Sequence, residues 1–189
     1  MVQIGTNDFR SGMKIEVDGQ PYTIVSVQFV KPGKGQAFTR VKLKHLLTAR
    51  TIERTFKSGD TVVEADVKEA KMRLLYVDSS GATFMDDETY EQIAIPLNKV
   101  EDMKQWLHED VIYSLLFYRG EPTTIEPPTF MEMEIVETAP GIRGDTSGRV
   151  LKPATTHTGA IVQVPIFIES GEWVKVDTRT GEYVSRINK

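Results

Sequence analysis

The chain has 189 residues, a net charge of −4 and 40% hydrophobic residues, which describes a soluble globular protein of one or two domains. It contains no apolar run near the ~20 residues that span a bilayer, and no basic segment followed by an apolar one at its N-terminus, so we expect neither a membrane span nor a secretory signal. The absence of cysteine excludes disulfides, thiolate catalysis and cysteine-ligated zinc, and it favours the reducing cytoplasm.

Charge is distributed unevenly along the chain. Residues 1–63 carry ten Lys/Arg and five Asp/Glu (+5), residues 64–127 carry six and fourteen (−8), and residues 128–189 carry seven and eight (−1). Between Lys31 and Lys57 there are eight basic residues and one acid, Glu53. Such an asymmetry suggests that the basic part has a polyanion as its partner.

Residues 1–63 are predicted to form a small β-barrel-like unit. Its longest feature is a β-hairpin made of strands at about 22–30 and 37–47, of the type with a loop of four or five residues. The other strands are expected at 14–17, 50–56 and 61–63, separated by turn residues.

Lys34 lies at the tip of this hairpin, between Gly33 and Gly35. Pro32 fixes its own φ and the glycines permit φ > 0, so the loop that begins at Lys31 favours a tight projection in which no adjacent side chain can pair with Lys34. Two interpretations stay open at this point. Lys34 is either an ordinary solvated turn residue or a group held out to reach a partner.

Three basic residues follow the tip at alternate positions: Arg40, Lys42 and Lys44. On a strand they share one face, because side chains alternate with a period of two. A row of cations at intervals of ~6.6 Å could follow a phosphate backbone by charge and geometry without reading bases. A solubilising outer face of a half-exposed strand explains the pattern equally well.

Residues 64–127 and 128–189 are each predicted to form a further small β unit. The first shows strands at 72–77, 82–85, 90–95 and 111–118 and a helix at 97–107, which suits an OB-like barrel, although a generic small barrel fits nearly as well. Pro127 and Pro128 mark the boundary. The second has a five-stranded pattern, of which four strands can be placed, near 131–135, 160–168, 173–177 and 183–187, with a glycine-rich loop at 140–148.

Enzyme sites are not predicted. Neither the Lys34 tip nor the segment 144–148 has the spacing of a phosphate-binding loop, and no serine lies in a nucleophile-elbow pattern. His45, His108 and His157 lie in different units, so we expect no metal site and regard the last two as surface turn residues. These patterns favour a binding or positioning protein over an enzyme.

Two groups of motifs resemble the bacterial elongation factor P family. The first combines NDFR at 7–10 with FVKPGKGQAF at 29–38, and the second runs from GDT at 144–146 through KPAT at 152–155 and GAIVQVPIFI at 159–168 to GEYVSR at 181–186. The likeness extends over the whole chain. It implies an all-β fold of three small barrels in an L-shaped, tRNA-like arrangement: a KOW/SH3-like domain at 1–63 and OB domains at 64–127 and 128–189.

The resemblance also implies a function in translation. Members of the family bind the 70S ribosome between the peptidyl and exit sites and relieve stalling at consecutive prolines. Proline reacts slowly because its ring makes the nitrogen a constrained secondary amine, and a factor that holds peptidyl-tRNA in an attack-ready geometry would accelerate the reaction by positioning alone. The resemblance therefore implies a cytoplasmic, monomeric factor that is not an enzyme and has no cofactor.

Particular residues match the family's functional positions. Lys34 matches the lysine that a modifying enzyme extends with a β-lysyl group, with a further hydroxyl in some members. The extension would add reach and hydrogen-bond donors to a flexible ammonium. The matching tip loop also includes Lys31, Pro32, Gly33 and Gly35. A second loop matches the element placed near the exit-site codon of the mRNA, and its residues are Gly144, Asp145, Thr146 and Gly148.

A general RNA-binding protein without a ribosomal site is the alternative hypothesis. RNA-stacking barrels usually show aromatic residues among basic ones on one face. The strand from Arg40 to Lys44 has no regular aromatic interleaving, and residues 128–189 are not basic, which disfavours this alternative. A nucleotide-dependent enzyme is a third hypothesis, and it is disfavoured because the sequence shows no phosphate-binding loop.

Overall fold

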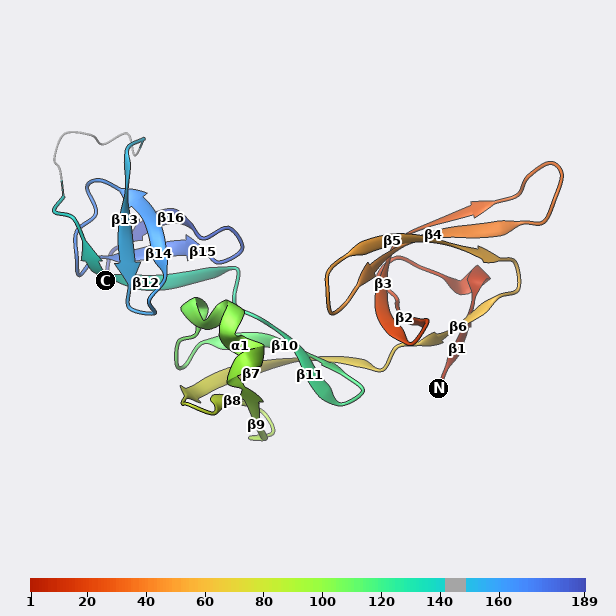
Figure 1. Cartoon of the computed structure of the whole chain (residues 1–189), viewed down its shortest axis with the longest axis horizontal. Helices are drawn as coiled ribbons and strands as arrows, with labels where there is room; N and C mark the ends of the chain where they lie inside the picture. The colour runs from red at the N-terminus through yellow and green to blue at the C-terminus, as the bar shows by residue number, and fades with distance from the viewer. Residues whose placement is uncertain (142–148) are drawn as a thin grey trace. The chain divides into compact units, whose positions relative to one another are not determined.

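The computed structural model describes residues 1–141 and 149–189, which form mainly antiparallel β-sheet (Figure 1). The predicted all-β class is confirmed. The chain makes two compact units, residues 1–69 with 116–124 and residues 70–115 with 125–189. Within the described ranges, every helix is too short or too polar to cross a bilayer.

The first sheet has six strands in the order β1-β6-β2-β3-β4-β5. Its inner face is closed by a cluster of apolar side chains, and the central three, Phe9, Ile24 and Leu43, are each at most 1% exposed. The strands are β1 (Gln3–Gly5), β2 (Lys14–Val17), β3 (Gln20–Val30), β4 (Phe38–His45), β5 (Thr51–Lys57) and β6 (Thr61–Glu64), with a 3₁₀ turn, η1 (Thr6–Asp8), after β1.

The second sheet has the order β11-β10-β7-β8-β9. One glycine is required here, because a Cβ on Gly81 would lie 2.0 Å from the Ile95 carbonyl oxygen on the neighbouring strand. The strands are β7 (Val67–Val77), β8 (Gly81–Met85), β9 (Gln92–Pro96), β10 (Ile112–Tyr118) and β11 (Glu121–Glu126).

The helix expected at 97–107 is only partly α-helical. A single α turn, α1 (Leu97–Val100), continues as a 3₁₀ helix, η2 (Glu101–Trp106). The inward side chains Val100, Met103 and Trp106 are spaced by three, which matches the three residues per turn of a 3₁₀ helix better than the α period. Trp106, 7% exposed, packs into the core of the third sheet.

The third sheet has the order β14-β13-β12-β15-β16, around a core that includes Met133, Val164 and Val174. The position of β13 was not predicted, because its inward residues Lys152 and Thr156 are polar and conceal the alternation. The strands are β12 (Phe130–Thr138), β13 (Leu151–Thr156), β14 (Ile161–Pro165), β15 (Trp173–Asp177) and β16 (Glu182–Ile187).

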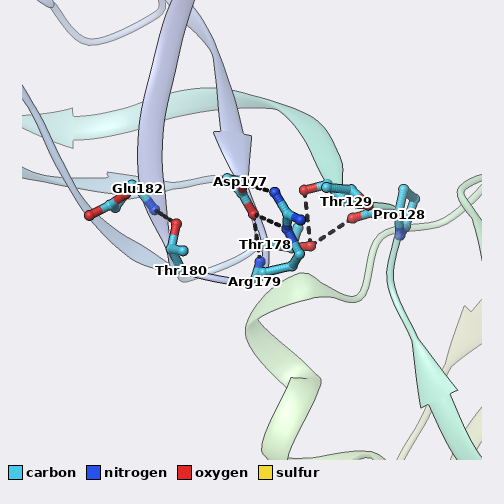
Figure 2. A network of polar contacts seen from close by, with 7 residues as sticks. All are labelled: Pro128, Thr129, Asp177, Thr178, Arg179, Thr180 and Glu182. Carbon is cyan, nitrogen blue, oxygen red and sulfur yellow. Dashed lines mark hydrogen bonds and ion pairs between the residues drawn. The ribbon is translucent and has the colours of Figure 1, made fainter. Parts of the chain in front are cut away.

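A polar network ties the entry of this sheet to the β15–β16 turn (Figure 2). The Thr178 N–H donates to the Thr129 carbonyl at 2.9 Å, and its Oγ1 donates to the Pro128 carbonyl at 2.7 Å. The Arg179 guanidinium donates hydrogen bonds to both carboxylate oxygens of Asp177, at 3.1 and 2.7 Å. This pairing holds the pKa of Asp177 below its ordinary value. The segment after Pro127 is therefore fixed by hydrogen bonds as well as by apolar packing.

Two histidines meet in the second unit, so the expectation that they lie apart was wrong. The rings of His108 and His157 contact edge to face with centroids 4.5 Å apart. The Thr158 Oγ1 donates to the Gln105 carbonyl at 2.6 Å, which brings the β13–β14 turn against the end of η2. His108 is exposed as expected, but His157 is partly buried and its Nδ1 accepts the Glu134 N–H at 3.0 Å.

The His157 environment predicts acid sensitivity of this unit. Burial, the neighbouring His108 and Lys189 lower the pKa of His157, against the opposing effects of Glu134. The folded state therefore binds the proton less tightly than the unfolded chain, whose histidine pKa is about 6.5. This contribution to stability is complete above that value and is lost as the pH falls below it toward the folded pKa.

We expect His157→Asn to reduce the loss of thermal stability between pH 7.5 and pH 5, because asparagine does not take up the proton. Fluorescence of Trp106 and Trp173, the two tryptophans, reports on this unit directly. His45→Asn, in the other unit, serves as the control and should keep the wild-type pH dependence of the fluorescence transition. Equal pH dependence in wild type and His157→Asn would contradict the prediction.

Candidate functional site

The hairpin of β3 and β4 is braced by a third strand. β3 pairs with β4 from Tyr22–His45 to Val30–Phe38, and β5 accompanies β4 as far as the pair Phe38–Lys57. An isolated two-stranded hairpin is only marginally stable in water, whereas a third strand with a buried face stabilises it. The base of the loop is therefore held by three strands.

The loop itself comprises the seven residues 31–37, longer than the four or five expected (Figure 1). Pro32 has no N–H to extend the ladder, and Gly35 adopts φ +111°, a conformation that disfavours side chains. The Pro32 ring lies across the loop, because its Cγ would be 3.8 Å from a Cβ on Gly35. Pairing consequently resumes only at Phe38.

Lys34 lies between Pro32 and Gly35 in the sequence, and its side chain is exposed. Lys31 and Gly33 are exposed as well. In the described part of the chain, no acidic side chain lies within ion-pair distance of Lys34 or Lys31. At the end of the loop the Ser58 N–H donates to the Ala37 carbonyl at 3.2 Å. The structure thus fixes the strands below the tip and leaves the lysine ammonium groups available to a partner.

The basic strand has the two-faced character that its sequence predicted. Arg40, Lys42 and Lys44 are exposed on one side of β4, while Val41 and Leu43 are fully buried on the other. Glu53, opposite Lys42, lies 3.4 Å from the Arg40 Nε and offsets part of the charge. The shared face is confirmed, whereas its binding to RNA stays a prediction.

Most of the glycine-rich loop of the third sheet, residues 142–148, lies outside the described residues. This applies to each residue that the sequence assigned to it: Gly144, Asp145, Thr146 and Gly148. On the described side, Thr138 Oγ1 donates to the Pro153 carbonyl at 3.0 Å, and Lys152 Nζ donates to the Ala139 carbonyl. These contacts join β12 and β13 where the described ranges end.

Clusters that could hold a metal ion are absent from ranges 1–141 and 149–189, judged by groups of three or more His, Asp or Glu side chains. The chemistry available at the tip is accordingly that of exposed ammonium groups, which bind anions and donate hydrogen bonds. The geometry supports contact with a phosphate-bearing partner.

Close relatives cover this chain from end to end. "Elongation factor P 2" of Chlamydia muridarum is 62% identical over 190 residues, 100% of both chains, and that of Chlamydia caviae is 63% identical with the same coverage. The chain belongs to the elongation factor P family. "Elongation factor P" of Caldanaerobacter subterraneus is 50% identical over 184 residues, which is 97% of this chain and 100% of the relative.

Three family models match consecutive parts of the chain. The elongation factor P KOW-like domain matches residues 5–62, its OB domain matches residues 67–125, and its C-terminal domain matches residues 131–186. The first matching range contains the Lys34 hairpin and the whole basic strand. The function shown by these findings is that of a translation elongation factor of this family.

Solved structures share the fold. A eukaryotic-type translation initiation factor 5A from Methanococcus jannaschii has a TM-score of 0.52 and 22% identity, covering 67% of this chain and 94% of the other. A family protein of the same initiation factor from Naegleria fowleri has a TM-score of 0.53 and 14% identity, covering 66% and 97%. At these identities the likeness concerns the β fold.

Charge reversal tests the basic strand. We expect Arg40→Glu with Lys42→Glu to weaken binding of a tRNA and to flatten the dependence of log affinity on log salt by roughly 1.5, because each lost phosphate contact removes about 0.7–0.9. Filter binding between 50 and 200 mM salt measures this slope. Lys68→Glu with Lys104→Glu reverses two exposed lysines elsewhere and should leave the slope unchanged. If the Arg40 and Lys42 variant keeps the wild-type slope, these residues form only a solvated face.

Proposed function

We propose that this protein binds the 70S ribosome between the peptidyl and exit sites and stimulates peptide-bond formation at consecutive prolines. The observation that carries the proposal is the exposed Lys34 on a three-stranded arm, without an ion-pair partner among the described residues, in a chain of the elongation factor P family. As a translation factor it would act in the cytoplasm, as a monomer, with peptidyl-tRNA as its direct partner.

Positioning is the mechanism that the residues favour. Proline's nitrogen is a constrained secondary amine, so few encounters with the peptidyl ester have reactive geometry. Holding the reacting groups in the correct orientation lowers the entropic part of the activation barrier. For well-oriented intramolecular reactions this effect corresponds to effective molarities of about 10⁵–10⁸ M. The ribosome supplies the peptidyl-transfer site, and the factor would supply order at the tRNA end.

Lys34 would make the decisive contact after modification. A β-lysyl extension would lengthen the arm and add an amine while it keeps the positive charge near tRNA phosphates and riboses. The flanking residues Gly33 and Gly35 have no side chains, so a lysine-modifying enzyme would meet little obstruction at the Lys34 ammonium. No other cofactor is part of the proposal.

Two further regions complete the proposed interface. The face of Arg40, Lys42 and Lys44 would follow a tRNA backbone by charge. The loop that contains Asp145 and Thr146 would lie near the exit-site codon of the mRNA, a role taken from its sequence motif alone. Both are assignments to be tested separately from the tip.

Removal of the tip ammonium tests the proposed function. We expect Lys34→Ala to lose rescue of a Pro-Pro-Pro reporter while its unfolding transition stays at the wild-type midpoint, since an exposed tip side chain contributes little to packing. Reporter synthesis in a reconstituted translation system, with protein purified from its own host, measures the rescue.

Two matched variants locate the effect. Lys34→Arg keeps the charge but blocks lysine modification, so it should lose most of the rescue if the extension matters. Lys68→Ala removes an exposed lysine elsewhere and should rescue normally. Normal rescue by a folded Lys34→Ala protein would refute the proposed function.

A further inference from the structure

Phe29 is an exposed aromatic residue at the end of the Lys34 arm. It lies on β3 two residues before the loop, and 55% of its surface is exposed. Single exposed apolar residues are common on proteins and by themselves mean little. The setting of Phe29 distinguishes it from such residues.

A row of aromatic residues leads from the core to this position. Phe29 and Phe56 flank Thr39 on the neighbouring strands, so all three lie on the same face of the sheet. Phe56 is partly buried and contacts the buried Phe9 edge to face, with centroids 5.4 Å apart. The row therefore ends in Phe29, whose backbone is fixed by strand pairing while its ring is open to a partner.

The surroundings of this ring are positively charged. Residues 29–40 and 55–58 contain Lys31, Lys34, Arg40 and Lys57 and no acidic residue. Arg40 belongs to the opposite face of the sheet, because its neighbour Thr39 shares the face of Phe29. The arm thus has a cationic row on one face, an aromatic ring on the other and Lys34 at the end between them.

We propose that Phe29 is a stacking platform for an unpaired nucleotide base of the RNA that Lys34 contacts. The proposal deepens the proposed function, since the RNA would be the single-stranded acceptor end of peptidyl-tRNA. An aromatic ring among lysines is the combination that binds single-stranded RNA, because the ring stacks on a base while ammonium groups neutralise the adjoining phosphates. A stacked base would also restrict rotation of the tRNA end, which is what positioning requires.

A protein surface, such as that of the lysine-modifying enzyme, is the competing occupant. The charge near Phe29 favours RNA, because a polyanion gains from the loop lysines Lys31 and Lys34, which have no acidic partner in the described part of the chain. The two occupants also differ chemically. A base needs the flat face of an aromatic ring, whereas a hydrophobic pocket on a protein accepts leucine nearly as well as phenylalanine.

The first experiment measures stacking without translation. In the full chain, Phe29→Trp introduces a fluorophore at the site, and wild type, which keeps Trp106 and Trp173, gives the background. A short unpaired oligoribonucleotide should quench the added fluorescence, while an abasic oligonucleotide of equal length and charge should quench it several-fold less. Equal quenching by the two, or quenching no greater than the wild-type background, would overturn the proposal.

The second experiment compares Phe29 variants in the Pro-Pro assay, using protein in which Lys34 modification has been equalised by mass. We expect Phe29→Ala and Phe29→Leu to need roughly tenfold more factor for half-maximal stimulation, as expected for loss of one base stack. Phe29→Trp should match wild type, and so should the control Tyr76→Ala, which removes an aromatic that is 46% exposed on β7. Wild-type behaviour of Phe29→Leu, or a defect that disappears once modification is equalised, would assign the ring to a protein partner and overturn the proposal.

The two proposals fail in different ways. If wild-type protein and Lys34→Ala are equally inactive but the oligonucleotide quenching depends on its bases, the proposed function fails and stacking stands. If wild-type protein stimulates and the quenching is independent of bases, the proposed function stands and stacking fails.

Discussion

The two-faced packing of β4 is the constraint on which the candidate site depends. Val41 and Leu43 are completely buried in the core of the first sheet, and this fixes both the register with β3 and the direction of every other side chain on the strand. A shift by one residue would bury Arg40 and Lys42 and expose their apolar neighbours, at a prohibitive cost in desolvated charge. The same burial that stabilises the domain therefore determines which face is cationic and where the Lys34 loop begins.

The strands of the arm hold the backbone in place, whereas the lysines of its loop are available to a partner. Up to the pair Phe38–Lys57 the backbone is held by three strands, and beyond it Pro32 and Gly35 close a loop whose lysines have no acidic partner in the described chain. A bound tRNA end would consequently lose conformational freedom on contact with a protein backbone that is already ordered. Little of the binding free energy would then be needed to order the protein. This division suits a factor whose contribution is position rather than chemistry.

Local sequence patterns predicted many of the strands and the cationic face of β4. They did not predict contacts between residues far apart in the sequence. Alternation identified the strands 14–17 and 173–177 to the residue, and it identified the cationic face. β13 was missed because its buried side chains include Lys152 and Thr156, and the loop was judged too short because Pro32 and Gly35 interrupt pairing on both sides. The contact of His108 with His157 joins residues 49 positions apart, and no local pattern could reveal it. The residues 144–148 were assigned from a motif, and that assignment is still a prediction.

The most direct test of positioning is a pH–rate profile of Pro-Pro bond formation, measured on ribosome complexes with and without the factor. The account predicts a higher rate with the same ionisation in both profiles, that of proline's own amine, together with a less unfavourable activation entropy in the presence of the factor. A general base at the tip would instead add an ionisation of its own. A new ionisation that appears only with the factor and is lost in Lys34→Ala would contradict positioning and assign a chemical role to the lysine.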